Sequence, residues 1–141
     1  MEQNGKKTEA IASYRKALVK TPDDPTALNN LAFLLADTGG DTKEALQLVS
    51  AALRKAPDVP QLKDTLAWIH IKRHETDEAL PILQSLTNKH PENNTFRYHY
   101  AVALIQSGDR AAAKRQAETA LSQKPPTELA GELQTLLTQV K

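Results

Sequence analysis

Two short patterns contain residue types that carry out chemistry in other proteins, and the first is Asp37-Thr38-Gly39. This triplet occurs in aspartic proteases, where two facing carboxylates share a proton. Those enzymes need the triplet on a β loop opposite a second copy. Here it follows a helical pattern and leads into the turn at Gly39-Gly40. We therefore interpret the triplet as a helix end without a catalytic role.

The second pattern is the pair His70 and His74, whose spacing of four residues can place two metal ligands on one helix face. His70 falls on a packing position, His74 falls in a turn, and no third ligand is suitably spaced. We interpret both as packing or solvent-facing residues, and His90 and His99 likewise. There is also no glycine-rich phosphate loop and no serine in a nucleophile elbow. The sequence therefore predicts neither an enzyme nor a metal or cofactor site.

Charge and composition exclude further classes. The chain of 141 residues has 18 basic and 17 acidic residues, which are interleaved and give a net charge of +1. Without a basic stripe, nucleic-acid binding is disfavoured. The first ten residues, MEQNGKKTEA, contain no apolar region typical of a secretory signal. Cysteine is absent, which fits the cytoplasm and the bacterial envelope or periplasm equally well, so the localisation stays open.

Alanine and proline recur along the chain at a fixed stride. The corresponding sets are Ala10, Ala17 and Pro22; Ala45, Ala52 and Pro57; Ala79, Leu86 and Pro91; and Ala113, Ala120 and Pro125. The step is 35 residues once and 34 residues twice. A period of this length is typical of stacked supersecondary units, none of which buries its apolar face alone.

Each period divides into two helical segments. In residues 25–59, apolar residues keep a helical spacing up to Leu35, stop at Gly39-Gly40, and resume from Ala45 until Pro57. Asp41 is placed as the N-cap of the second helix, with Glu44 as its reciprocal partner. The same pattern predicts helices near residues 60–73, 76–89, 94–107 and 109–123. We therefore expect an all-α protein made of helix hairpins.

These residues resemble the tetratricopeptide repeat (TPR), a unit of 34 residues. The small-residue and proline positions of that family are occupied by Ala32, Ala45, Ala52 and Pro57; Ala67, Ala79, Leu86 and Pro91; and Ala101, Ala113, Ala120 and Pro125. Leu86 alone departs among these, which predicts a locally wider helix contact. The resemblance implies a right-handed superhelical α-solenoid. Its parts are an incomplete repeat at 1–24 (mainly the second helix), repeats at 25–59, 60–93 and 94–126, and a capping helix at 127–141.

The two ends of the chain differ when the sequence is aligned with the 34-residue repeat. Met1 to Gly5 falls on the last turn of a first helix and its turn glycine, so we expect the chain to be a fragment that begins inside a repeat. The following helix, residues 7–20, then lacks its partner and leaves Ile11 and Tyr14 partly uncovered. We expect it to fray or to pair with another molecule, as in a homo-oligomer. At the other end, Thr127 is placed to cap a helix, and the apolar stripe of that helix covers the last hairpin.

The resemblance also implies a concave groove lined by the first helices of successive repeats. Its candidate binding residues are Asn29, Phe33, Asp37, Asp64, Trp68, Lys72, Tyr98 and Val102. The aromatic residues among them are typical anchors for a bound peptide or helix. The alternative is that they only pack adjacent helices together. Asp64 and Tyr98 stand where a clamp for chaperone tails would need a cation or an amide, which disfavours a terminal carboxylate as ligand.

The sequence therefore predicts a non-catalytic scaffold that binds a protein or peptide partner in its groove. The alternative is a structural spacer or self-association module within a larger TPR array. The runs at residues 29–36 and 64–68 are similar to bacterial TPR lipoproteins associated with exosortase sorting (the PEP-CTERM system). That narrower resemblance would imply a role in envelope polysaccharide export or protein sorting. The residues do not identify the partner.

Overall fold

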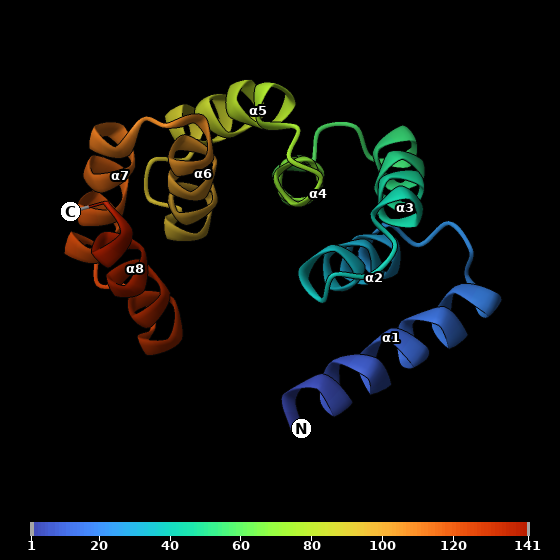
Figure 1. Ribbon diagram of the computed structural model, residues 1–141. Helices are drawn as coiled ribbons and strands as arrows, with labels where there is room; N and C mark the ends of the chain where they lie inside the picture. The colour runs from blue at the N-terminus through green and yellow to red at the C-terminus, as the bar shows by residue number, and fades with distance from the viewer. Residues whose placement is uncertain (1, 141) are drawn as a thin grey trace. The chain divides into compact units, whose positions relative to one another are not determined.

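The computed structural model describes the backbone of residues 2–140 and the side chains of residues 5–140. Among these residues there are eight α-helices and no strands (Figure 1). The helices are α1 (Glu2–Lys20), α2 (Pro25–Asp37), α3 (Thr42–Lys55), α4 (Pro60–Lys72), α5 (Thr76–Lys89), α6 (Asn94–Ser107), α7 (Arg110–Ser122) and α8 (Thr127–Gln139). They form two compact units, one containing α1–α4 and the other α5–α8. The all-α prediction is confirmed for the described residues.

Local sequence explains where four of the described helices begin. The side chains of Asp24, Asp41, Asn93 and Asp109 each accept a hydrogen bond from a backbone N–H of the following first turn. Such caps satisfy N–H groups that have no partner inside the helix. At the other end of α6, Gly108 has φ of 93°, a left-handed conformation that glycine adopts without strain. The chain can therefore pass directly from α6 to α7.

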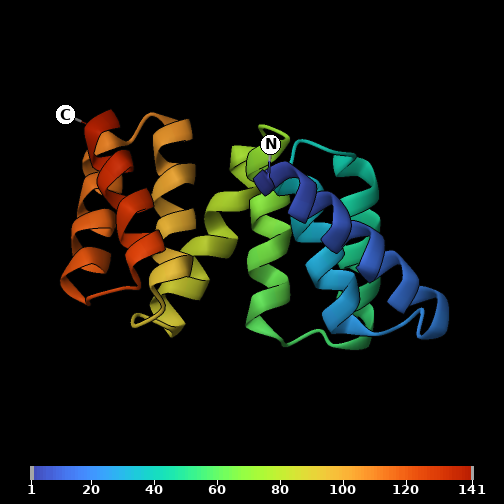
Figure 2. The same ribbon diagram turned by 90° about the horizontal axis from the view of Figure 1, so that it is seen from below.

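In the first unit, α2 contacts all three of the other helices, and α3 also packs against α4 (Figure 2). The alanines at the predicted small-residue positions, Ala32, Ala45, Ala52 and Ala67, are completely buried at 0% exposure. Ala52 lies in a cluster with Leu28 and Leu62. A larger side chain at such a position would have to push two helices apart.

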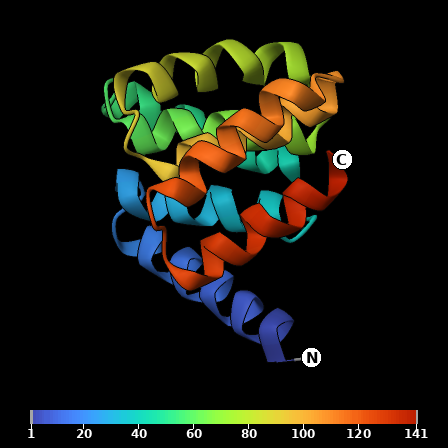
Figure 3. The same cartoon turned by 90° about the vertical axis from the view of Figure 1, so that its left-hand side faces the viewer.

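In the second unit, α6 packs against α5, α7 and α8, and α7 also packs against α8 (Figure 3). Ala79, Ala101, Ala113 and Ala120 are again 0% exposed. Leu133 and Leu136 of α8 join the alanines of α6 and α7 in one core cluster, while the polar face of α8 is exposed. The predicted apolar stripe of the last helix is therefore confirmed. Leu86 is buried, and the wider contact expected there stays a prediction.

Three local predictions are corrected. Gly5 lies inside α1 rather than in a turn, and Met1 is outside the described residues. A glycine costs a helix only about 1 kcal/mol relative to alanine, so good helix formers on its C-terminal side can continue the helix through it. Thr127 is the first residue of α8 and not its cap, because Pro126 precedes the helix in an extended conformation. Asp41 caps α3 as predicted, but the Glu44 carboxylate binds Arg15 of α1.

Burial along α1 differs from burial along α3, although the two helices share one pattern. Ala10 is half-buried and Ala17 is exposed, whereas their counterparts Ala45 and Ala52 are 0% exposed. Ile11 and Tyr14 are also half-buried, as predicted. Alanine at these positions is therefore buried only where a second helix packs against it. None of the described helices is both long and apolar enough to cross a lipid bilayer.

Candidate functional site

Two adjacent pockets lie between α2 and α4 in the first unit, and together we call them the α2–α4 groove. The first, the Phe33 pocket, has a volume of about 440 Å³. It is lined by Ala10, Tyr14, Asn29, Asn30, Phe33, Leu34, Gln61, Asp64 and Thr65. The second, the Thr26 pocket, has a volume of about 460 Å³. It is lined by Pro25, Thr26, Asn29, Asn30, Ala56, Val59, Gln61 and Leu62.

Three amide side chains, Asn29, Asn30 and Gln61, line both pockets and so mark their junction. The Oδ1 atom of Asn29 is buried and has no hydrogen-bond partner among the residues that the structure describes. A buried acceptor without a partner costs free energy, on the order of 1–3 kcal/mol. A bound molecule that donates a hydrogen bond to this oxygen would recover that cost. The amide junction can therefore accept hydrogen bonds from N–H groups and donate them to carbonyl groups.

Aromatic and charged side chains continue along α2 and α4 from the Phe33 pocket. The rings of Phe33 and Trp68 stack with centroids 6.3 Å apart and an interplanar angle of 20°. The Lys72 ammonium lies 4.9 Å from the centre of the Trp68 ring, a cation–π contact. Trp68 itself is only 6% exposed. The contact of Trp68 with Phe33 agrees with the alternative that these aromatics pack adjacent helices, and only Phe33 keeps substantial surface.

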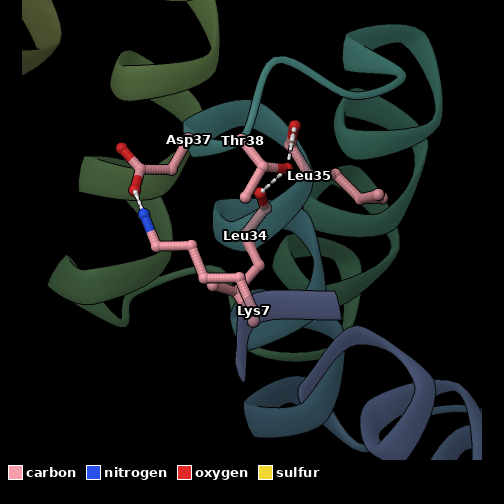
Figure 4. A network of polar contacts seen from close by, with 5 residues as sticks. All are labelled: Lys7, Leu34, Leu35, Asp37 and Thr38. Atoms are coloured by element: carbon pink, nitrogen blue, oxygen red, sulfur yellow. Dashed lines mark hydrogen bonds and ion pairs between the residues drawn. The ribbon is translucent and has the colours of Figure 1, made fainter. Parts of the chain in front are cut away.

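Asp37 takes part in the end of α2 instead of lining either pocket (Figure 4). Its Oδ2 atom lies 3.2 Å from Nζ of Lys7 in α1, forming an ion pair. The next residue, Thr38, donates its hydroxyl hydrogen to the Leu34 carbonyl at 2.7 Å. Gly39 then turns the chain with φ of 75°. The Asp-Thr-Gly triplet is thus a helix end, as predicted, and it ties α2 to α1.

Tyr98 and Val102 lie on α6 of the second unit, where both are half-buried and pack against the core cluster of that unit. Ala36 of α2 and Ile71 of α4 are 1% and 4% exposed and have little surface to offer a ligand. Of the eight candidate residues, Asn29, Phe33 and Asp64 come together in one pocket. Their role in binding stays a prediction.

The Phe33 pocket also contains residues that the sequence analysis did not assign to a site. Tyr14 and Ala10 come from α1, and Asn30, Leu34 and Thr65 lie beside the expected positions on α2 and α4. Tyr14 was identified only as a partly uncovered residue. The missing signal is the way α1 packs against α2, because this packing adds a third helix to the wall of the pocket.

The histidines do not form a metal site in the described part of the chain, where no three histidine or acidic side chains gather closely enough to hold an ion. His74 lies in the turn before α5 with φ of 60°. Its Nδ1 atom forms a hydrogen bond of 3.2 Å with the Gln106 amide. The environment of His74 is therefore that of a turn residue tied to α6.

One ion pair outside the groove holds α1 on the first hairpin. The Arg15 guanidinium donates two hydrogen bonds to the Glu44 carboxylate, at 2.7 and 3.1 Å. These hydrogen bonds are the main cause that lowers the pKa of Glu44 and raises the pKa of Arg15. Because both side chains are partly exposed, the pair stabilises the fold by at most about 1 kcal/mol. It joins α1 to α3, and Arg15 directly follows Tyr14, which lines the Phe33 pocket.

Comparison with known proteins places the chain in a family. The sequence profile of the tetratricopeptide repeat matches residues 1–125. A TPR repeat-containing protein of Pseudomonas aeruginosa is 29% identical over 79 residues. That alignment covers 56% of this chain but only 13% of the relative, so the chain spans about an eighth of its length.

Several solved structures have the same fold as this chain. A thermophilic TPR protein of Thermus thermophilus matches with a TM-score of 0.82 at 19% identity, covering 98% of this chain and 76% of that one. A TPR protein of Parabacteroides merdae matches with a TM-score of 0.84 at 20% identity, covering 99% of this chain and 53% of that one. MamA of Desulfovibrio magneticus RS-1 matches with a TM-score of 0.68 at 17% identity, covering 97% of this chain and 77% of that one.

These matches confirm the predicted α-solenoid of TPR hairpins. TPR proteins are in general non-catalytic scaffolds for protein–protein interaction. The profile match extends over most of the sequence, and the hairpins with buried alanines at the family's small-residue positions are its structural counterpart. The chain therefore belongs to the tetratricopeptide repeat family.

Proposed function

We propose that this chain is a non-catalytic interaction scaffold that binds a segment of a partner protein in the α2–α4 groove. The observation that carries the proposal is the buried Asn29 Oδ1 atom at the junction of two pockets, for which residues 5–140 supply no hydrogen-bond partner. A peptide backbone offers N–H donors along its length, and such donors suit this oxygen. The two pockets can then hold side chains on either side of the bound N–H group.

The pockets differ in chemistry, which favours a segment with two different side chains. None of the described residues that line the Thr26 pocket is charged, and the lining includes Ala56 and Val59. Val59 is a large apolar side chain that is 38% exposed, so an apolar group of the partner could cover it. The Phe33 pocket is partly aromatic. Tyr98 and Val102 of the second unit remain predicted contacts for a partner, in addition to the groove.

The proposal can be tested with a random peptide library displayed on phage and selected on the full chain. The informative variant is Gln61→Ala, because Gln61 is exposed and lines both pockets. Gln47→Ala is the matched control, since Gln47 is exposed on α3 and lines neither pocket. We expect Gln61→Ala and Asn29→Ala to weaken the selected peptides by roughly tenfold, the effect of losing one or two hydrogen bonds. Equal binding by all four proteins would exclude the groove as the binding site.

A second candidate function, self-association through α1, is favoured by the exposure of Ala17 and by Val19, which is 82% exposed. Sedimentation velocity over a concentration series tests it. Ala17→Glu should then shift the chain to monomers, while Gln134→Glu on the exposed face of α8 should not. A chain that is monomeric at every concentration would remove this candidate.

A further inference from the structure

We propose that α1 of one copy binds the exposed face of α8 of a second copy, head to tail; this inference rests on the second candidate function, self-association, and specifies the surface that α1 contacts. Two cations of α1 already have partners within their own unit. Lys7 forms an ion pair with Asp37, and Arg15 forms one with Glu44. Both pairs join α1 to the first hairpin, so these two cations are engaged inside the unit.

The other three cations of α1, Lys6, Lys16 and Lys20, are exposed and form no ion pair with the residues that the structure describes. Lys16 and Lys20 are about one helical turn apart, and Lys6 and Lys20 are about four turns apart, so the three lie on one side of the helix. Glu9 is the only acidic residue among the described side chains of α1. The exposed side of α1 therefore carries a net positive charge.

The acidic residues next to α1 interact with other groups. Asp23 and Asp24 follow in the turn after α1, close in sequence to Lys20. The Oδ2 atom of Asp23 lies 3.6 Å from Nζ of Lys55, and Asp24 accepts a hydrogen bond of 3.1 Å from the backbone N–H of Thr26. The positive charge on this side of α1 therefore suits an acidic surface of another molecule.

The last helix, α8, has an acidic surface of this kind. Glu128 and Glu132 are exposed and four positions apart, so they lie on the same face of the helix. They are the only charged residues of α8. Lys124 is exposed in the turn before α8, and within the described part of the chain it forms no ion pair with either glutamate. The exposed face of α8 therefore complements the charge of α1.

Charge also decides between α8 and a second α1 as the partner. Two α1 helices would place lysines against lysines, which is unfavourable at an interface, whereas opposite charges meet when α1 lies on α8. Lys16 is three positions before Val19, which is 82% exposed, so the contact would also cover apolar surface. Because α1 and α8 are different surfaces of one chain, such a contact is heterologous, and assembly continues beyond a dimer.

The test is a charge exchange between the two helices, followed by sedimentation velocity over a concentration series of the full chain. The α1 variant carries Lys16→Glu and Lys20→Glu, and the α8 variant carries Glu128→Lys and Glu132→Lys. Each variant alone brings like charges together, so we expect it to need about tenfold more protein to reach the sedimentation coefficient of the wild type. An equimolar mixture of the two variants should associate as the wild type does, because opposite charges meet again.

Matched controls change the net charge by the same amount at exposed residues elsewhere. Lys43→Glu with Arg54→Glu is the control for the α1 variant, and Glu92→Lys with Glu118→Lys is the control for the α8 variant. Both controls should sediment as the wild type does, and circular dichroism checks that every variant keeps its helices. Raising the salt concentration from about 0.1 M to about 1 M shortens the Debye length from about 10 Å to about 3 Å, which should weaken the association.

A wild-type chain that is monomeric at every concentration would overturn the inference together with the second candidate function. An α8 variant that associates like the wild type would overturn the α8 contact alone and leave self-association through α1 intact. Loss of association in both variants without recovery in their mixture would show that the two charged faces do not meet. None of these outcomes involves the α2–α4 groove, so the peptide selection with Gln61→Ala tests the main proposal separately.

Discussion

Replacing alanine by leucine at two equivalent repeat positions tests why small residues recur in this chain. Ala52 of α3 is 0% exposed and packs in a cluster with Leu28 and Leu62. Leucine adds three carbon atoms at a site without free space, so the helices must move or the side chain must leave its preferred rotamer. Such overpacking costs about 1–3 kcal/mol. Ala17 occupies the same position in α1 but is exposed, so leucine there meets no second helix.

The stabilities of the two variants can be compared directly because both substitutions are made in helices with the same sequence pattern. Leucine and alanine have similar helix propensities, so Ala17→Leu should change the free energy of unfolding by less than about 0.5 kcal/mol. Urea titrations followed by circular dichroism at 222 nm measure both variants against the wild type. We expect a lower midpoint with an unchanged slope for Ala52→Leu and no resolved change for Ala17→Leu.

Either of two results would refute the reasoning. If Ala17→Leu destabilises as much as Ala52→Leu, a helix must pack on that face of α1 in solution. If neither variant is destabilised, close helix approach is not what requires alanine at these positions. A change in the slope would instead indicate that the two units unfold separately, since repeat proteins unfold through nearest-neighbour steps.

Three further substitutions should change the free energy of unfolding, two by lowering it and one by raising it. Trp68→Ala should cost about 3–5 kcal/mol in thermal or urea unfolding, because the ring is 6% exposed and stacks on Phe33; a loss below about 1 kcal/mol would show that the ring contributes little to the core. Glu44→Gln should cost about 0.2–1 kcal/mol at neutral pH. The pKa of Glu44 is lower in the folded state than in the unfolded state, so the stabilisation is present above the unfolded-state pKa. It is lost as the pH falls through the folded-state pKa. A cost of Glu44→Gln that persists in acid would therefore contradict the ion pair. Gly5→Ala should stabilise α1 by up to about 1 kcal/mol, because Gly5 is helical and an added Cβ would have nothing within 4 Å. The measurement is hydrogen exchange, in which the amides near the N-terminus should exchange more slowly. Faster exchange would favour a turn at Gly5.

Helix boundaries were predictable because local chemistry sets them. The predicted segment 76–89 is α5, and 94–107 is α6, since Asn93 caps α6 and Gly108 ends it in a conformation suited to glycine. The failures are also local. At Gly5 a turn was expected from the repeat frame, but a glycine can also lie within a helix at modest cost.

The candidate site was only partly predictable. Asn29, Phe33 and Asp64 were expected on one face of successive first helices, and they do line one pocket. Trp68, expected to be an anchor, is nearly buried by its neighbours. The contribution of Tyr14 could not be predicted, because it depends on the angle and depth at which α1 packs on α2, and no local pattern encodes these.

The period of alanine and proline by itself determined that this protein is a series of helix hairpins, because proline ends a helix locally and small residues recur where neighbouring helices meet. Burial was decided only in three dimensions. Ala17 and Ala52 stand in the same sequence context, yet one is exposed and the other is inaccessible to solvent. Solvent exposure depends on which helix lies across from a residue, and the chemistry of the α2–α4 groove arises in the same way from side chains of separate helices.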